Sequence, residues 1–212
     1  MAVISACLTF AAAQNVVDKD DAQSWNDLQL TVPITKQFDF YTALTARFGK
    51  NLTQVSDQRF AVGFVYKPHK NWSLMPFYWN LGARNSRNHF RGEHRLNLRV
   101  GYRLPFKKLV LSHRSTFEYR FRQPANSWRY RPSLTLEKDI AQKIIPKAKF
   151  YVTEEVFYDS LLKKFSRHRL TVGITKTLTE QLSLDIYFMR QNDGFSRPGD
   201  LNVIGMNWKI RL

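Results

Sequence analysis

Apolar and polar residues alternate along the chain with a period of two, which is the periodicity of a β-strand and not of a helix. From His94 to Leu104 the even positions are mostly apolar, while the odd positions carry arginine, asparagine or glycine. The alternation recurs in eleven segments, near residues 24–32, 37–48, 57–68, 72–82, 93–104, 108–122, 128–138, 146–158, 167–178, 181–192 and 200–212. The pattern predicts an all-β protein.

The stretch from Ser115 to Lys138 shows that each face of these strands needs its own environment. One face carries Phe117, Tyr119, Phe121, Trp128, Tyr130, Leu134 and Leu136, and the other carries Glu118, Arg120, Arg122, Arg129, Arg131 and Glu137. Soluble sandwiches and lipid-embedded barrels both alternate, so alternation alone does not choose between them. Length does, because soluble strands have about 5–6 residues, whereas these run to about 10–14, enough to cross a bilayer at a tilt.

The connections and the aromatic residues also favour a barrel in a membrane. Short stretches (PITK, PHKN, PFKK, LTEQ) alternate with longer ones (GKNLTQVS, GARNSRNHF, DSLLKKFS, DGFSRPG), with QPANS and DIAQKI as intermediate exceptions. Outer-membrane barrels have short periplasmic turns and longer external loops. Aromatic residues near the predicted strand ends fit interfacial girdles: Trp25, Tyr41, Trp72, Tyr102, Trp128, Tyr130, Tyr158 and Trp208. We therefore predict a single antiparallel transmembrane β-barrel over residues 23–212.

The positions of the two termini favour an even number of strands. Export delivers the N-terminus to the periplasm, and a C-terminus on the same side requires an even number of strands, as bacterial single-chain barrels usually have. Residues 14–22 could reach about 30 Å when extended, so they could add a short strand or thread the lumen. We predict about twelve strands, with ten as the next choice.

The N-terminal stretch MAVISACLTFAAAQ is apolar and uncharged, and it ends in three alanines, as secretory signals do. We expect a signal peptide over residues 1–13, a short lead over 14–22, and further residues upstream, because the usual basic region is missing. An alternative is a lipoprotein signal ending at Cys7. Cys7 is the single cysteine, so the remaining chain has no thiol chemistry.

The net charge of +16 indicates an anionic partner or an internal position for the charges. Nucleic-acid-binding sheets place basic and aromatic side chains on one face, whereas here the two kinds occupy opposite faces. We therefore expect no nucleic-acid partner, and we place the charge in a polar lumen and on the loops. The expected partners are outer-membrane lipid and lipopolysaccharide, periplasmic chaperones, the barrel assembly machinery and an anionic solute.

Several motifs resemble a known family. The elements DLQLTVPITKQFDF, EYRFR, WRYR, EEVFY, SRHRLTVGITKTLTEQLSLDIYFMRQ and DLNVIG occur in the order found in the bacterial outer-membrane family called domain of unknown function 2490. The resemblance extends from Gln23 to Leu212. It implies an exported β-barrel in the outer membrane of a Gram-negative bacterium, and it implies no activity.

The candidate site is a set of charged residues on the predicted lumenal face. It comprises Arg114, Glu118, Arg120, Arg122, Arg129, Arg131, Glu137, Lys147, Lys149, Glu155, Arg167 and Arg169. Neighbouring antiparallel strands let Glu118 meet an arginine such as Arg131. We predict a salt-bridged core that keeps a small barrel rigid. The alternative is a narrow anion-handling barrel, because the nine cations exceed the three carboxylates and charged rings set pore selectivity.

The sequence also contains candidate residues for two other functions. A lipid-modifying enzyme would use a serine and a histidine, and His113 and Ser115 are weak candidates on the outer face. Their separation of about 7 Å along a strand is long for a nucleophile and its base, so we favour a protein that is not an enzyme. A barrel that binds lipopolysaccharide phosphates would use Lys50, Arg84, Arg87 and Arg91.

The sequence offers no cofactor motif. The histidines show no metal-ligand spacing, and no phosphate-binding glycine loop is present. We expect no metal and no cofactor.

Overall fold

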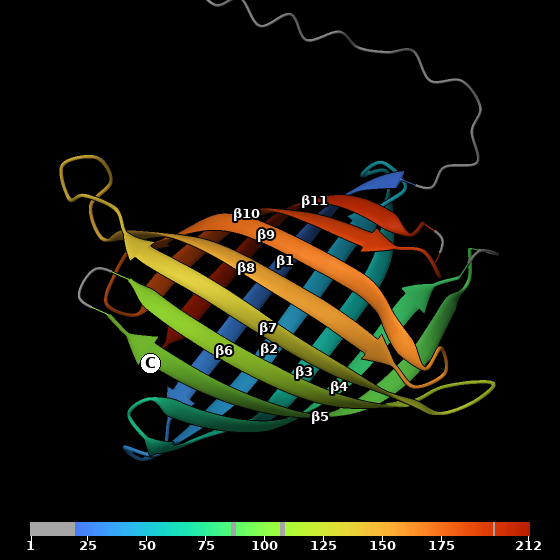
Figure 1. Cartoon of the computed structure of the whole chain (residues 1–212), viewed down its shortest axis with the longest axis horizontal. Helices are drawn as coiled ribbons and strands as arrows, with labels where there is room; N and C mark the ends of the chain where they lie inside the picture. Colours follow the sequence, from blue (N-terminus) through green and yellow to red (C-terminus); the bar gives the residue numbers. More distant parts are fainter. Residues whose placement is uncertain (1–19, 86–87, 107–108, 197) are drawn as a thin grey trace, which may run out of the picture.

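The computed structural model describes residues 20–85, 88–106, 109–196 and 198–212, which form a closed β-barrel (Figure 1). Its eleven strands are β1 (Asp20–Pro33), β2 (Phe38–Gly49), β3 (Gln54–His69), β4 (Trp72–Arg84), β5 (Phe90–Pro105), β6 (Val110–Phe121), β7 (Ser127–Asp139), β8 (Ala148–Asp159), β9 (Lys164–Thr177), β10 (Leu182–Asp193) and β11 (Asp200–Arg211). The all-β prediction is confirmed. Within the described residues, no helix is long and apolar enough to span a membrane.

The barrel closes differently from the prediction. Each strand is antiparallel to its neighbours in sequence, but β1 and β11 run parallel, with Asp20 beside Asp200 and Thr31 beside Arg211. An odd number of strands makes the first and last run in the same direction, so the closing ladder must be parallel. Because β2 and β11 occupy both edges of β1, no edge is left for a twelfth strand between them.

The eleven strands lie within the predicted range of ten to twelve, but the favoured number of twelve and the all-antiparallel closure are wrong for the described barrel. The boundary also moves, because the first strand begins at Asp20 rather than Gln23. The predicted signal segment, residues 1–13, and most of the predicted lead lie outside the described residues.

The two ends of the barrel carry connections of similar length. One end, called the C-terminal end, carries Leu212 and the connections 34–37, 70–71, 106–109, 140–147 and 178–181. At the other, called the N-terminal end, β1 begins, and the connections are 50–53, 85–89, 122–126, 160–163 and 194–199 (Figure 1). The predicted contrast between short turns and long loops is wrong, because the strands extend into the predicted loops and the longest connection lies at the C-terminal end.

The barrel has a polar interior and an apolar exterior. Phe117 and Trp128 are 50% and 47% exposed, whereas Glu118, between them in the hairpin, is 2% exposed. Every strand presents at least one exposed large apolar side chain, including Leu28, Leu44, Phe60, Trp72, Leu96, Phe117, Leu134, Phe150, Leu170, Ile186 and Ile204. The prediction that each strand has one apolar and one polar face is confirmed. The exposed apolar side chains form a ring that is much larger than the apolar patches of monomeric soluble proteins.

The aromatic residues divide between the two faces. On the outside, Trp72 packs on Tyr102 with ring centroids 4.6 Å apart, and Trp128 stacks on Tyr158 at 5.4 Å. The predicted girdle position of Trp25 is wrong, because Trp25 is buried inside the barrel against Met189, Leu201 and Val203. Tyr41 is also misassigned and lines the lumen.

Candidate functional site: the charged lumen

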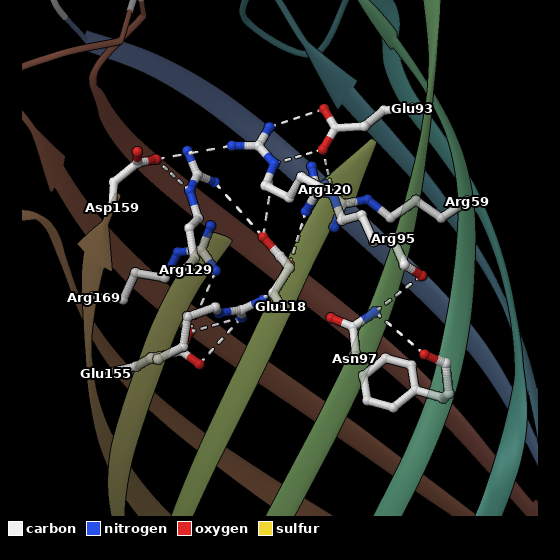
Figure 2. Close-up of polar contacts among 12 residues, drawn as sticks. Arg59, Glu93, Arg95, Asn97, Glu118, Arg120, Arg129, Glu155, Asp159 and Arg169 are labelled. Atoms are coloured by element: carbon white, nitrogen blue, oxygen red, sulfur yellow. Dashed lines mark hydrogen bonds and ion pairs between the residues drawn. The ribbon is translucent and has the colours of Figure 1, made fainter. Parts of the chain in front are cut away.

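Glu118 on β6 lies at the centre of an arginine cluster inside the barrel (Figure 2). Its carboxylate accepts hydrogen bonds from Arg95 on β5 at 3.1 Å and from Arg131 on β7 at 3.3 Å. Arg120 and Arg129 lie 3.8 and 4.0 Å away. The period of two puts Glu118 and Arg120 on the same face of β6, and the neighbouring strands supply the other arginines.

Two more carboxylates extend this cluster toward the N-terminal end. Glu93 on β5 binds the guanidinium of Arg120 through two hydrogen bonds of 2.5 and 2.9 Å, and it also accepts one from Arg95 at 2.7 Å. Asp159, the last residue of β8, accepts from Arg129 at 2.7 Å and lies 3.9 Å from Arg120. Paired, forked contacts of this kind are strong and directional.

Glu155 on β8 anchors the other side of the cluster. It accepts hydrogen bonds from Arg114 at 3.0 Å, from Arg131 at 3.1 and 3.2 Å, and from Arg169 at 3.4 Å. Arg131 therefore links Glu155 to Glu118. We call the connected set Glu93, Arg95, Arg114, Glu118, Arg120, Arg129, Arg131, Glu155, Asp159 and Arg169 the lumen network.

Seven of the twelve predicted residues belong to the lumen network, and the rest lie elsewhere. Arg167 pairs with Asp193, and Glu137 pairs with Arg103 at 3.4 Å near the C-terminal end. Arg122, Lys147 and Lys149 form no ion pair among the described residues. Glu93, Arg95 and Asp159 were not predicted, although their odd numbers put them in phase with Arg99 or Glu155. Their place in the alternation was the signal that could have assigned them to the lumenal face.

A cavity of about 430 Å³ lies on the C-terminal side of the lumen network. Its wall includes Arg114 but not Glu118 or Arg120, which follow on β6 toward the N-terminal end. A second hollow of about 360 Å³ shares Glu137, Tyr151, Thr175 and Lys209 with the cavity and continues it toward the C-terminal end. The lumen is thus filled in its N-terminal half and hollow in its C-terminal half.

A family model for proteins of unknown function, DUF2490, matches residues 22–202. The chain belongs to the DUF2490 family. A solved structure, "NanC porin structure in rhombohedral crystal form", is similar with a TM-score of 0.55, at 11% identity over 91% of this chain and 99% of that chain. This similarity concerns the fold. No curated protein matches the chain.

The two weak catalytic candidates of the DUF2490 protein do meet on its outer face. His113 Nε2 lies 3.0 Å from Ser115 Oγ, which lies 3.0 Å from the hydroxyl of Tyr130. The side chains close the distance that separates their backbones. No carboxylate bonds to His113 among the described residues, so the orienting acid of a catalytic triad is missing there.

Similar pairing occurs around other histidines of this apolar face. His94 lies 2.5 Å from the Tyr78 hydroxyl, and His168 lies 3.3 Å from Glu154. Polar groups in an apolar environment need partners, and the backbone N–H groups here serve the sheet rather than an oxyanion site. The His113–Ser115 contact is explained by mutual satisfaction of polar groups.

Not all the residues of the predicted lipopolysaccharide site at the N-terminal end are available to bind phosphate. Arg84 donates to the Val55 carbonyl at 2.7 Å and to the Asn88 carbonyl at 2.9 Å, so its guanidinium links β3 to the connection 85–89. Lys50 and Arg91 are exposed, and Arg87 lies outside the described residues. Across the described part of the chain, no three His, Cys, Asp or Glu side chains are grouped to hold a metal ion.

Proposed function

We propose that this DUF2490 protein is a membrane-embedded β-barrel of the bacterial outer membrane, with a lumen closed by ion pairs and a cavity that opens toward the periplasm. The observation that carries the proposal is the inverted burial: carboxylates and guanidinium groups fill the interior while apolar side chains ring the outside. The similarity to a porin fold supports it.

We propose that the C-terminal end of the barrel faces the periplasm, which puts the cavity mouth on that side. Because β1 and β11 run parallel, β1 then begins at the outer face. Delivery through periplasmic chaperones and insertion by the barrel assembly machinery belong to the same proposal.

The lumen network explains how a strongly cationic interior remains stable. Buried charges are costly unless they are paired and hydrogen-bonded. Glu118 contacts four arginines and Glu155 contacts three. These contacts run across neighbouring strands, so they fix the strands relative to one another. We propose that the N-terminal half of the lumen is a rigid core, and that the DUF2490 protein is a structural or anion-handling barrel rather than an open pore.

The membrane location is tested by fractionation. The full chain, expressed in a Gram-negative host, should be found in the outer-membrane fraction and should migrate faster on gels before heating than after it, as a folded barrel does. Recovery of folded protein in the soluble periplasmic fraction would overturn the proposal. A variant with Leu134→Lys and Leu170→Lys in the outer apolar ring should fail to insert, because lysine in the bilayer is costly, whereas Lys149→Leu at the C-terminal end should insert normally.

A further inference from the structure

The cavity wall carries more positive than negative groups. Its seven cationic residues are Arg47, Arg59, Arg99, Arg114, Arg131, Arg169 and Lys209, and its four carboxylates are Asp27, Glu137, Glu155 and Asp185. Some of these charges are matched locally: Arg59 forms two hydrogen bonds with Asp57, and Lys209 lies 3.3 Å from Asp185. The unmatched positive charge of the cavity wall therefore lies on a few particular arginines.

Arg47 and Arg99 form no ion pair with any described residue. The guanidinium of Arg47 lies 3.4 Å from the centre of the Trp25 ring, and that of Arg99 lies 4.9 Å from the Phe77 ring. Arg99 also points Nη1 at the Met75 sulfur, 3.7 Å away. In both arginines the Nε is buried and has no acceptor within the described residues. An aromatic face holds a guanidinium in place but leaves its N–H edge free to bind a planar anion.

Arg114 adds a second positive charge beside Arg99. Arg99 lies opposite Thr116, and Arg114 lies opposite Gly101, so the two arginines are diagonal neighbours on the inner face of β5 and β6. Glu155, the ion-pair partner of Arg114, is shared with Arg131 and Arg169. The Nε of Arg114 also lacks an acceptor. Like charges at this spacing repel, and a bound anion relieves the repulsion.

Glycines opposite two tyrosines keep the cavity open. A Cβ on Gly173 would lie 2.6 Å from the Tyr151 hydroxyl, and a Cβ on Gly205 would lie 1.9 Å from the Tyr187 ring. The rings therefore lie against the backbone of the neighbouring strand instead of projecting into the lumen. Threonine hydroxyls complete the wall and can donate to an anion.

We infer that the cavity binds a small solute that carries a carboxylate or phosphate group, held by the guanidinium groups of Arg99 and Arg47 with help from Arg114. Two arginines on different strands favour an anion with more than one charge. Asp27 lines the same cavity, forms no ion pair with the part of the chain that the structure describes, and opposes binding. The inference rests on the proposed closed barrel, because a closed N-terminal half makes the cavity a pocket rather than a passage.

Calorimetric titration of the refolded full chain in detergent tests the site, with inorganic phosphate and citrate as probes at low, matched ionic strength. We expect saturable binding that weakens about tenfold or more in Arg99→Gln and in Arg47→Gln, because each loses a charge-assisted contact. Asp27→Asn should tighten binding. Arg190→Gln is the matched control, because Arg190 pairs with Asp200 outside the cavity and should not affect binding.

A stability measurement separates a ligand site from a structural role. Arg99→Met removes a cation that has no carboxylate partner, so the urea midpoint of unfolding should stay or rise while anion binding falls. A lower midpoint with unchanged binding would assign Arg99 to the fold and overturn the inference. Absence of saturable binding to either anion would also overturn it. Fractionation reports separately on the membrane location, so a correctly inserted barrel that binds no anion refutes this inference alone.

Discussion

The two halves of the lumen are built from the same alternating strands but use their inner faces differently. In the N-terminal half, Glu93, Glu118 and Asp159 meet arginines at close range, and the side chains fill the space. In the C-terminal half, threonine and glycine leave a cavity, and Arg99 has no carboxylate partner among the residues that the structure describes. Placing charges inside a barrel therefore does not decide what they do. The position of the carboxylates decides it.

The change occurs along single strands. On β6, Arg120 and Glu118 belong fully to the packed half, whereas Arg114, nearer the C-terminal end, borders the cavity. Arg114 is also less buried than the other two residues. Charge pairing and packing therefore weaken together along the strand, as expected if the packed half stabilises the barrel and the hollow half serves binding.

Glu118→Ala should have the largest effect, because it removes the central carboxylate of the packed half. Four arginines would lose a buried partner, and removing one member of a buried pair typically costs about 3–5 kcal/mol. The measurement is the free energy of unfolding by urea, followed by the gel shift on heating. Glu137→Ala is the control, because its pair with Arg103 is far more exposed than Glu118 and should contribute about 1 kcal/mol or less. Equal losses in both variants would refute the special role of the packed half.

Gly205→Ala should close part of the hollow half. The new methyl group would overlap the Tyr187 ring, so the ring must turn into the cavity or the strands must separate, at a cost of about 1–3 kcal/mol. Unfolding midpoints and anion titrations measure the two consequences. At Gly194 a Cβ would meet nothing within 4 Å, so Gly194→Ala should be neutral. Unchanged stability and binding in Gly205→Ala would contradict the account of the cavity wall.

His113→Ala should have the smallest effect and tests the outer face. It removes one hydrogen bond to Ser115, worth about 0.5–1.5 kcal/mol, and leaves both halves of the lumen unchanged. His89→Ala, in an exposed connection, is the control. Phospholipid and lipid A turnover should be absent in the unsubstituted protein. Turnover that His113→Ala abolishes would instead support the enzyme hypothesis.

Periodicity was sufficient to predict the strands and their faces. Each of the eleven alternating segments is a strand, and Phe117 and Glu118 lie on the predicted faces. The parallel closure follows from the eleven segments themselves, but the even strand number of most bacterial barrels favoured adding a twelfth strand, and that expectation was wrong. The inward position of Trp25 was not predicted, because an aromatic residue at a strand end suits either an interfacial girdle or a packed interior.

The site was predictable only where it depends on adjacent strands. The Glu118–Arg131 contact joins β6 to β7 across one hairpin, which the sequence suggested. Arg114 and Glu155 lie on β6 and β8 with β7 between them, so their contact depends on barrel curvature, strand tilt and side-chain length. The cavity depends on the register that places Gly205 opposite Tyr187, which no local pattern reveals.

Single-channel conductance of the refolded chain in a planar bilayer tests the closed lumen most directly. The unsubstituted barrel should insert but remain silent, because the lumen network fills its N-terminal half. The Glu118→Ala barrel should show openings as the network loosens. Steady conductance from the unsubstituted protein, equal to that of Glu118→Ala, would contradict the claim that ion pairs close the lumen.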